Sequence, residues 1–193
     1  SSSNGLEKYP KLRFKGFSEP YRVVSLGDIA CEVSRTDPNS KAPVMMLSAG
    51  NGFIMQSEKY SRDNAGQSLK KYTLLKKGEL AYNHGASKAK QFGCCYQLKV
   101  DEALVPFVYH CFSVNMEYAP YISTVLNIPT TERQLKKLVS SSVRMDGLLN
   151  ISYDDYMTVE LALPSIDEQQ KVSCFISLLE EKIKKQQQLV DHL

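Results

Sequence analysis

The spacing of hydrophobic and polar residues is most regular in the last part of this 193-residue chain. Apolar residues there recur at alternating intervals of four and three, at Val172, Ile176, Leu179, Ile183, Val190 and Leu193. Gln186 takes the remaining position of this seam, and charged residues occupy the other faces. A narrow apolar seam on a charged helix is typical of a coiled coil. We therefore expect the seam to contact a partner helix.

The start of this helix is marked by Pro164 and Ser165. Ser165 and Glu168 match a capping box, in which the hydroxyl and the carboxylate each accept a hydrogen bond from a backbone N–H group. No Gly or Pro follows, which allows a helix of about 28 residues and ~42 Å. We expect a globular domain at 1–164 and the helix at 165–193. A helix that lies on its own domain is the alternative, but the narrow seam and the length favour one that leaves it.

Shorter apolar segments fill the region before this helix. Strands are expected at residues 22–26, 44–48, 53–54, 71–75, 79–82, 92–98, 148–151 and 158–163. The Gly50-Asn51-Gly52 triplet predicts a tight hairpin turn. Helices are expected at residues 106–115, 121–126 and 130–139, and Pro106 suits the first turn of the first one. The pattern predicts an α+β (mixed α/β) domain followed by the long helix.

Charge is spread unevenly, although the net charge is only +3. The helix carries −1 and the body +4, and residues 59–90 hold eight Lys or Arg against two acidic residues, a net charge of +6. Such a block favours a surface that binds a polyanion such as nucleic acid. A solvated lysine-rich surface would have the same composition, so charge alone leaves both interpretations open.

Catalytic motifs are thin. The three histidines are scattered without metal-ligand spacing, and the five cysteines include no CxxC pair. A thiol–imidazole pair of Cys94 or Cys111 with His110 is the weak enzyme alternative, because neighbouring residues on a strand or helix point apart. We expect no catalytic residue, metal or cofactor. Reduced cysteines and the lack of an apolar run of membrane-spanning length predict a cytoplasmic protein with no membrane contact.

A polar, basic loop after the strand at 79–82 carries the better candidates for binding. The Asn83 amide can pair with both a donor and an acceptor on adenine, and His84 can donate to a base. Ser87 can donate to a phosphate, and Lys88 and Lys90 can neutralise phosphates. Each of these residues could instead be an ordinary surface residue, but their concentration beside the basic block favours a DNA contact.

Arg144 is a second candidate for reading bases. It lies in a loop flanked by serines and by Gly147. A guanidinium group can pair bidentately with guanine. The alternative is a surface or internal ion pair.

Three stretches of the sequence together suggest a family. They are residues 10–17 (PKLRFKGF) leading into 26–29 (LGDI); residues 78–83 (GELAYN) with Ser87 and Gly93, followed by Val105-Pro106 and Phe112; and residues 143–152 (VRMDGLLNIS), running to LP at 163–164 and EQQKV at 168–172. This set resembles the specificity subunit of type I restriction-modification enzymes, and the LP-x-x-x-EQQKV ending is its most specific part. Residues 88–91 (KAKQ) depart from the glycine and proline that such proteins often have there.

The resemblance implies a target recognition domain followed by a spacer helix. A full specificity subunit has two of each, and its antiparallel helices hold two domains that each read half of a split target in double-stranded DNA. Methylation and cleavage belong to the modification and restriction subunits that dock on it. The chain would then be a half subunit or a fragment that pairs with its own copy or with a second recognition domain. A coiled-coil adaptor without sequence-specific DNA binding is the competing function.

Overall fold

A central antiparallel sheet organises the body of the molecule. The computed structural model describes residues 4–56, 70–139 and 149–191. The sheet has the strand order β2 (Ala30–Glu32), β9 (His110–Val114), β6 (Leu80–Asn83) and β7 (Cys94–Gln97). The connection from β6 to β7 is the polar loop that the sequence singled out.

Two-stranded antiparallel pairs flank this sheet. They are β1 (Arg22–Ser25) with β10 (Glu160–Leu163), β3 (Met45–Ser48) with β4 (Gly52–Met55), and β5 (Thr73–Lys76) with β8 (Glu102–Val105). The β3–β4 pair confirms the predicted hairpin. Gly50 and Gly52 have positive φ angles of 85° and 74°, a conformation that glycine adopts at little cost.

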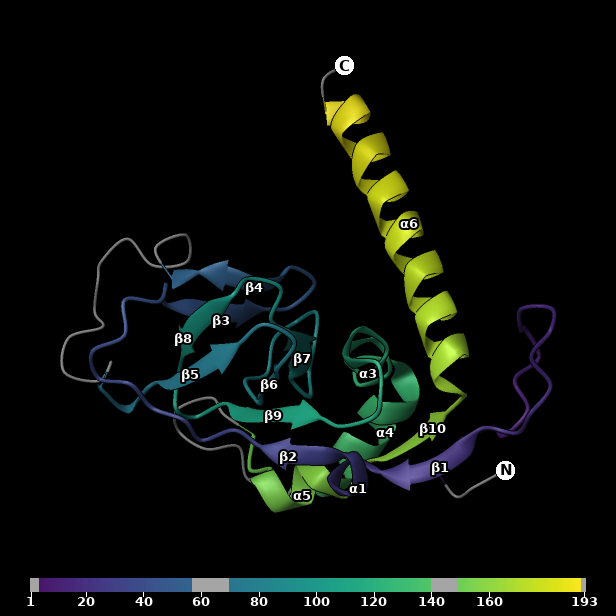
Figure 1. Cartoon of the computed structure of the whole chain (residues 1–193), viewed down its shortest axis with the longest axis horizontal. Coiled ribbons are helices and arrows are strands. Elements are labelled where there is room, and N and C mark those ends of the chain that lie inside the picture. The colour runs from purple at the N-terminus through teal and green to yellow at the C-terminus, as the bar shows by residue number, and fades with distance from the viewer. Residues whose placement is uncertain (1–3, 57–69, 140–148, 192–193) are drawn as a thin grey trace.

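Short helices cover one side of the central sheet. They are α1 (Leu26–Ile29), α3 (Ala119–Val125), α4 (Pro129–Leu138) and α5 (Tyr153–Met157). Figure 1 shows the β3–β4 and β5–β8 pairs on one side of the sheet and these helices on the other. Successive residues of a strand point to opposite faces. Accordingly, Leu80 and Tyr82 of β6 enter one hydrophobic cluster and Ala81 enters the other, and Cys111 and Phe112 of β9 divide in the same way. The sheet is therefore buried on both faces.

The prediction of a helix at residues 106–115 is wrong. Pro106 begins a turn, closed by a hydrogen bond of 3.0 Å from the Tyr109 N–H to the Pro106 carbonyl, and the chain then enters β9. A strand buried on both faces has a continuous apolar run that resembles a buried helix segment. Pro106, which suits a helix start, suits a turn equally well.

Other predicted elements are found close to their expected places. The helices predicted at 121–126 and 130–139 are confirmed as α3 and α4, and the strand predicted at 158–163 is confirmed as β10. Of the strand predicted at 148–151, the described part has no regular structure.

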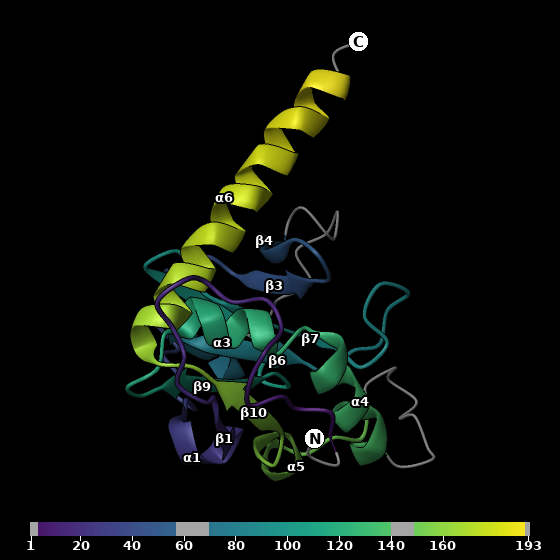
Figure 2. The same ribbon diagram turned by 90° about the vertical axis from the view of Figure 1, so that its right-hand side faces the viewer.

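The chain ends in α6 (Ile166–Asp191), which confirms the predicted long helix and the α+β class of the body. Figures 1 and 2 show it leaving the body and projecting well beyond it. We call residues 166–176 its base and residues 177–191 its tip. Every residue of the tip is exposed. The Ser165 hydroxyl accepts the Glu168 N–H at 3.4 Å, but the Glu168 carboxylate binds elsewhere, so only half of the predicted capping box forms.

Candidate nucleic-acid interface

The loop between β6 and β7 is held by its own hydrogen bonds. The Asn83 side-chain oxygen accepts the Gly85 N–H at 2.9 Å, a turn that asparagine commonly makes. Farther along, the Ser87 hydroxyl oxygen accepts the Lys90 N–H at 3.0 Å, and the Ser87 N–H donates to the Lys90 carbonyl at 3.0 Å. These bonds give the loop a defined shape, with Lys88 exposed at its turn.

Gly93 allows the two ends of the loop to approach closely. A Cβ atom on Gly93 would lie 2.3 Å from the Asn83 carbonyl oxygen and 2.8 Å from the Tyr82 ring, and its φ is +81°. Both the contact and the backbone angle require glycine at this position. The position of Asn83 therefore depends on a residue ten places later in the chain.

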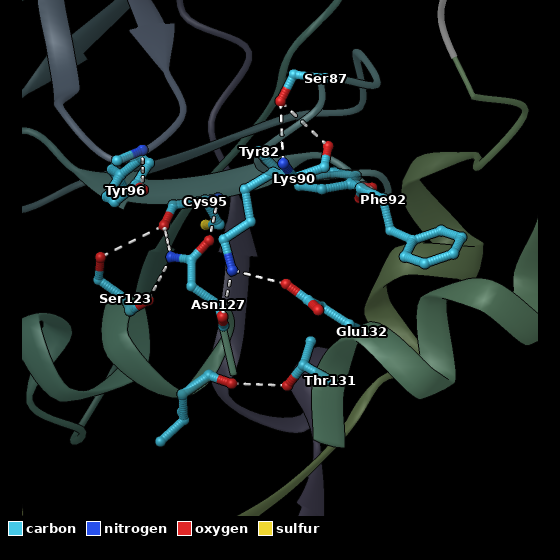
Figure 3. Close-up of polar contacts among 12 residues, drawn as sticks. Tyr82, Ser87, Lys90, Phe92, Cys95, Tyr96, Ser123, Asn127, Thr131 and Glu132 are labelled. Carbon is cyan, nitrogen blue, oxygen red and sulfur yellow. Dashed lines mark hydrogen bonds and ion pairs between the residues drawn. The ribbon is translucent and has the colours of Figure 1, made fainter. Parts of the chain in front are cut away.

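Lys90 anchors the loop to α4. Its ammonium group donates to the Glu132 carboxylate and to the Asn127 carbonyl, both at 2.6 Å (Figure 3). The Lys90 side chain is 21% exposed, so its charge is largely neutralised within the protein. This role differs from the predicted phosphate contact. The sequence could not reveal it, because Glu132 lies 42 residues away.

Asn127 extends this anchor to the central sheet. Its amide nitrogen donates to the Cys95 and Ser123 carbonyls, and its oxygen accepts the Cys95 N–H at 3.2 Å (Figure 3). The same residue thus holds strand β7, the end of α3 and, through its own carbonyl, Lys90. The loop and α4 are fixed to one another and to the sheet.

His84 is buried, with 4% of its surface exposed. Its Nδ1 lies 2.8 Å from the Leu149 carbonyl and its Nε2 lies 2.9 Å from the Val108 carbonyl. Both ring nitrogens therefore face backbone carbonyls of the body, which can only accept hydrogen bonds. This position inside the body differs from the predicted donation to a base.

His110 supports the same segment from beside His84. The two rings stack at 4.8 Å, and the His110 Nε2 lies 2.8 Å from the Ile151 carbonyl. Burial lowers the pKa of His110, and the neighbouring His84 adds to this shift against the opposing effect of the Ile151 carbonyl. The two histidines thus fix residues 149–151, close in sequence to the candidate Arg144. That arrangement was not predicted.

Helix α4, to which Lys90 is bound, also carries exposed basic residues. Figure 2 shows α4 and the β6–β7 connection on the same side of the body. Arg133, Lys136 and Lys137 of α4 are exposed, as are Ser87 and Lys88 of the loop. Arg144, Lys59 and Arg62 lie outside the described residues. Ser87 and Lys88 are the predicted phosphate contacts that the structure leaves exposed to solvent.

The predicted helix seam divides between the base and the tip of α6. Val172 packs against the hydrophobic cluster of the body, and Ile176 is half-buried. Leu179, Ile183 and Val190 are 42%, 68% and 54% exposed. Leu193 lies outside the described residues. The apolar positions of the tip are the part of the seam that the body leaves uncovered.

The three buried cysteines are poorly suited to nucleophilic chemistry. Cys94, Cys95 and Cys111 are buried. Burial raises the pKa of Cys95 and raises that of Cys111 to about 12, which disfavours the reactive thiolate. Within the described residues, no group of three or more His, Cys, Asp or Glu side chains is placed to hold a metal ion. Nor does that part of the chain contain a helix long and apolar enough to span a membrane.

The sequence matches no protein-family model and no curated protein. Its fold, by contrast, matches solved structures. The HsdS subunit from Thermoanaerobacter tengcongensis aligns with a TM-score of 0.53 and 12% identity over 94% of this chain and 42% of that chain. A structure described as the "Structural basis underlying complex assembly andconformational transition of the type I R-M system" aligns with a TM-score of 0.58 and 14% identity, over 93% of this chain and 46% of the other.

This chain therefore has the fold of the specificity subunit of type I restriction-modification systems. It spans less than half the length of the two neighbours. The resemblance first noted in the sequence motifs is confirmed at the level of the fold.

Proposed function

We propose that this chain is the DNA-reading half of a type I restriction-modification specificity subunit. The observation that carries the proposal is the match of one body and one long helix, almost the whole of this chain, to less than half of each neighbour. A full specificity subunit contains two such units. One unit would read one half of a split DNA target.

The proposed DNA contacts lie on the β6–β7 loop and its surroundings. Lys88 is exposed and contacts a phosphate, with Ser87 beside it. Asn83 and Arg144 contribute to base readout, for which amide and guanidinium groups are suited. Lys90 and His84, which the structure engages internally, hold the loop and the segment after Arg144 in place.

The tip of α6 is proposed to pair with another helix. Leu179, Ile183 and Val190 present an apolar seam that the described part of the body does not cover. The partner is a second copy of this chain or the helix of a second recognition domain. In two identical chains paired antiparallel, a two-fold axis relates the recognition domains.

This symmetry specifies the form of the DNA target. Two copies present the same loops in opposite orientations, so the target is a short inverted repeat with an unread gap. The 26 residues of α6 extend ~39 Å. That length is comparable to one turn of DNA, ~34 Å. Gln186 in the seam helps to fix the register, because a polar residue in an apolar seam penalises misaligned pairing.

The chain itself is proposed to catalyse nothing. Modification and restriction subunits dock on it and supply methylation and cleavage, and the assembly works in the cytoplasm without a cofactor held by this chain. The buried thiols support this assignment, since they disfavour the Cys/His alternative.

The test is to co-express the chain with its modification subunit and to map methylated adenines across the host genome. A split palindrome is the expected result. Two different half-sites would mean that the chain is one arm of a mixed subunit. A parallel gel shift with random duplex separates DNA reader from adaptor: the reader binds and weakens steeply with salt, whereas an adaptor gives no shift and no methylated sites, which would contradict the proposal.

A further inference from the structure

The base of α6 is attached to the body by buried polar contacts as well as by apolar packing. Glu168 is 1% exposed. The Arg13 guanidinium donates to both Glu168 carboxylate oxygens, from Nε at 2.8 Å and from Nη2 at 2.7 Å. The Tyr21 hydroxyl also donates to this carboxylate, at 3.2 Å. A bidentate guanidinium–carboxylate pair has a defined geometry as well as a favourable energy. The Glu168 carboxylate therefore fixes where the first turn of α6 lies.

Gln169 makes a second set of contacts in a different direction. It is fully buried, and its amide nitrogen donates to the Glu117 carboxylate at 2.6 Å and to the Pro164 carbonyl at 3.0 Å. Its oxygen accepts the Tyr118 N–H at 3.0 Å. Glu117 and Tyr118 precede α3, whereas Arg13 and Tyr21, the partners of Glu168, belong to the N-terminal segment. Two neighbouring residues thus bind the body on two sides of the helix.

Aromatic contacts continue the attachment along the base. The Phe14 and Phe175 rings meet edge to face at 5.6 Å. The Lys171 ammonium lies 5.2 Å from the Phe14 ring and 5.7 Å from the Phe17 ring. Figures 1 and 2 show the N-terminal segment looping beside the base of α6, with α3 close to the same end of the helix. We call Arg13, Phe14, Phe17 and Tyr21 the clasp.

Stability alone does not account for a charged pair at this position. A buried ion pair contributes little compared with well-packed apolar residues of similar size. Its directional bonds, by contrast, favour one arrangement over others that bury the same area. The Tyr21 hydroxyl adds a further directional bond to the same carboxylate, and burial and the Glu168 charge raise its pKa to about 12.

We propose that Arg13, Glu168 and Gln169 are positioning residues that fix the direction in which α6 leaves the body. The consequence of this direction for DNA binding rests on the proposed function, in which the direction of α6 sets the distance between two recognition domains. The helix is a lever of ~39 Å, so a turn of about 10° at its base moves its end by ~7 Å. That displacement equals about two base-pair steps of 3.4 Å. A loosened base would therefore allow more than one gap between the half-sites.

The direction of α6 can be measured without DNA. Spin labels are placed on the full-length chain at Gln188→Cys in the tip and Lys99→Cys in the body, both exposed, after the exposed Cys31 and Cys174 are changed to serine. Excess unlabelled chain suppresses distances between copies. Double electron–electron resonance then gives the distribution of the helix–body distance.

Glu168→Gln and Arg13→Gln should each broaden that distribution at least twofold. The matched control is Arg35→Gln, which breaks a bidentate pair with Glu79 that does not touch α6. It should leave the distribution unchanged. Arg13→Lys keeps the charge but loses the fork and should broaden it by less. If a glutamine variant loses its near-ultraviolet circular dichroism, the distance distributions of Arg13→Lys and Tyr21→Phe are used instead to test the proposal. A wild-type distribution in every folded variant of Glu168, Arg13 and Tyr21, or equal broadening in Arg35→Gln, would overturn the proposal.

The DNA consequence is read from methylation maps of the same variants. The expected result is unchanged half-sites with at least one additional gap length for Glu168→Gln, and one gap length for the wild type and Arg35→Gln. If no variant methylates DNA while the distance distributions change as expected, the proposed function fails and the positioning role stands. Unchanged distributions with normal methylation would reject the positioning role alone.

Discussion

The base and the tip of α6 share one helix and one apolar seam, yet their surroundings differ completely. At the base, Val172 packs against the body, and Glu168 and Gln169 are buried among polar partners. At the tip, Leu179, Ile183 and Val190 are exposed. A continuous sequence pattern is therefore divided between a part attached within the chain and a part left exposed, which is the part proposed to pair with another helix. The sequence pattern of α6 alone does not show this difference, because it depends on which part of the helix the folded body covers.

The largest effect should distinguish two glutamines of this helix. Gln169→Ala should lower the free energy of unfolding by about 3 kcal/mol, because it removes a fully buried amide and leaves the buried Pro164 carbonyl and the Tyr118 N–H without this hydrogen-bond partner. The matched change at the tip, Gln187→Ala, removes only an exposed contact to Asp191 and should cost less than about 0.5 kcal/mol. Urea denaturation measures both. Similar losses would show that the base is no better attached than the tip.

Charges in the tip should act on association and leave the fold intact. Leu179→Asp combined with Ile183→Asp should weaken helix pairing about a hundredfold, ~2.7 kcal/mol, because pairing would bury unpaired carboxylates. Sedimentation velocity should then show a folded monomer. Val172→Asp serves as the contrast, since it should destabilise the body instead. An unchanged mass for the double variant would contradict the pairing role.

The same contrast between an engaged and a free side chain occurs in the β6–β7 loop. Lys88→Ala should weaken binding to every DNA sequence and reduce the slope of log affinity against log salt by about one unit, the effect of one lost phosphate contact. Lys90→Ala should act through the loop instead, because its partners are Glu132 and Asn127. Gel shifts over a range of salt measure the slope. Equal slopes for Lys88→Ala and the wild type would remove Lys88 from the interface.

The smallest expected effect is a loss of stability at low pH, and it should arise in the body and not in α6. The folded pKa of His110 is lowered below 6.5, so the unfolded chain binds this proton at a higher pH than the folded one. Stability should therefore be highest above about pH 6.5 and should fall as the pH drops below that value. His110→Asn should flatten this dependence, measured by urea denaturation between pH 7 and pH 5. A wild-type slope in His110→Asn would assign the effect to other groups.

Local patterns in the sequence were enough to predict much of the fold. The long helix, the β3–β4 hairpin and helix α4 follow from apolar spacing and from Gly and Pro positions. The segment at 106–115 was misread because a strand buried on both faces has the apolar content of a helix. Periodicity alone does not separate the two.

The environment of the candidate site was less predictable. Residue types suggested that His84 and Lys90 would face DNA, but their partners Leu149 and Glu132 lie 65 and 42 residues away. Arg13 and Glu168 are separated by 155 residues, and no spacing rule connects them. In the sequence, the polar run Glu168-Gln169-Gln170-Lys171 does not distinguish the buried Glu168 and Gln169 from the exposed Gln170 and Lys171.

The pairing of β1 with β10 has a consequence for how such a body can change. Arg22 lies opposite Leu163, so the strand that follows the clasp runs beside the strand that leads into α6. The frame that aims the helix is therefore closed by its own first and last strands. Apart from Glu117 and Tyr118, which contact Gln169, the loops between Ser25 and Glu160, including the β6–β7 loop, are inserted between these two strands. These loops can lengthen, shorten or be exchanged for others while the exit of the helix stays where it is, so that, under the proposed function, a new reading surface would need no new spacer.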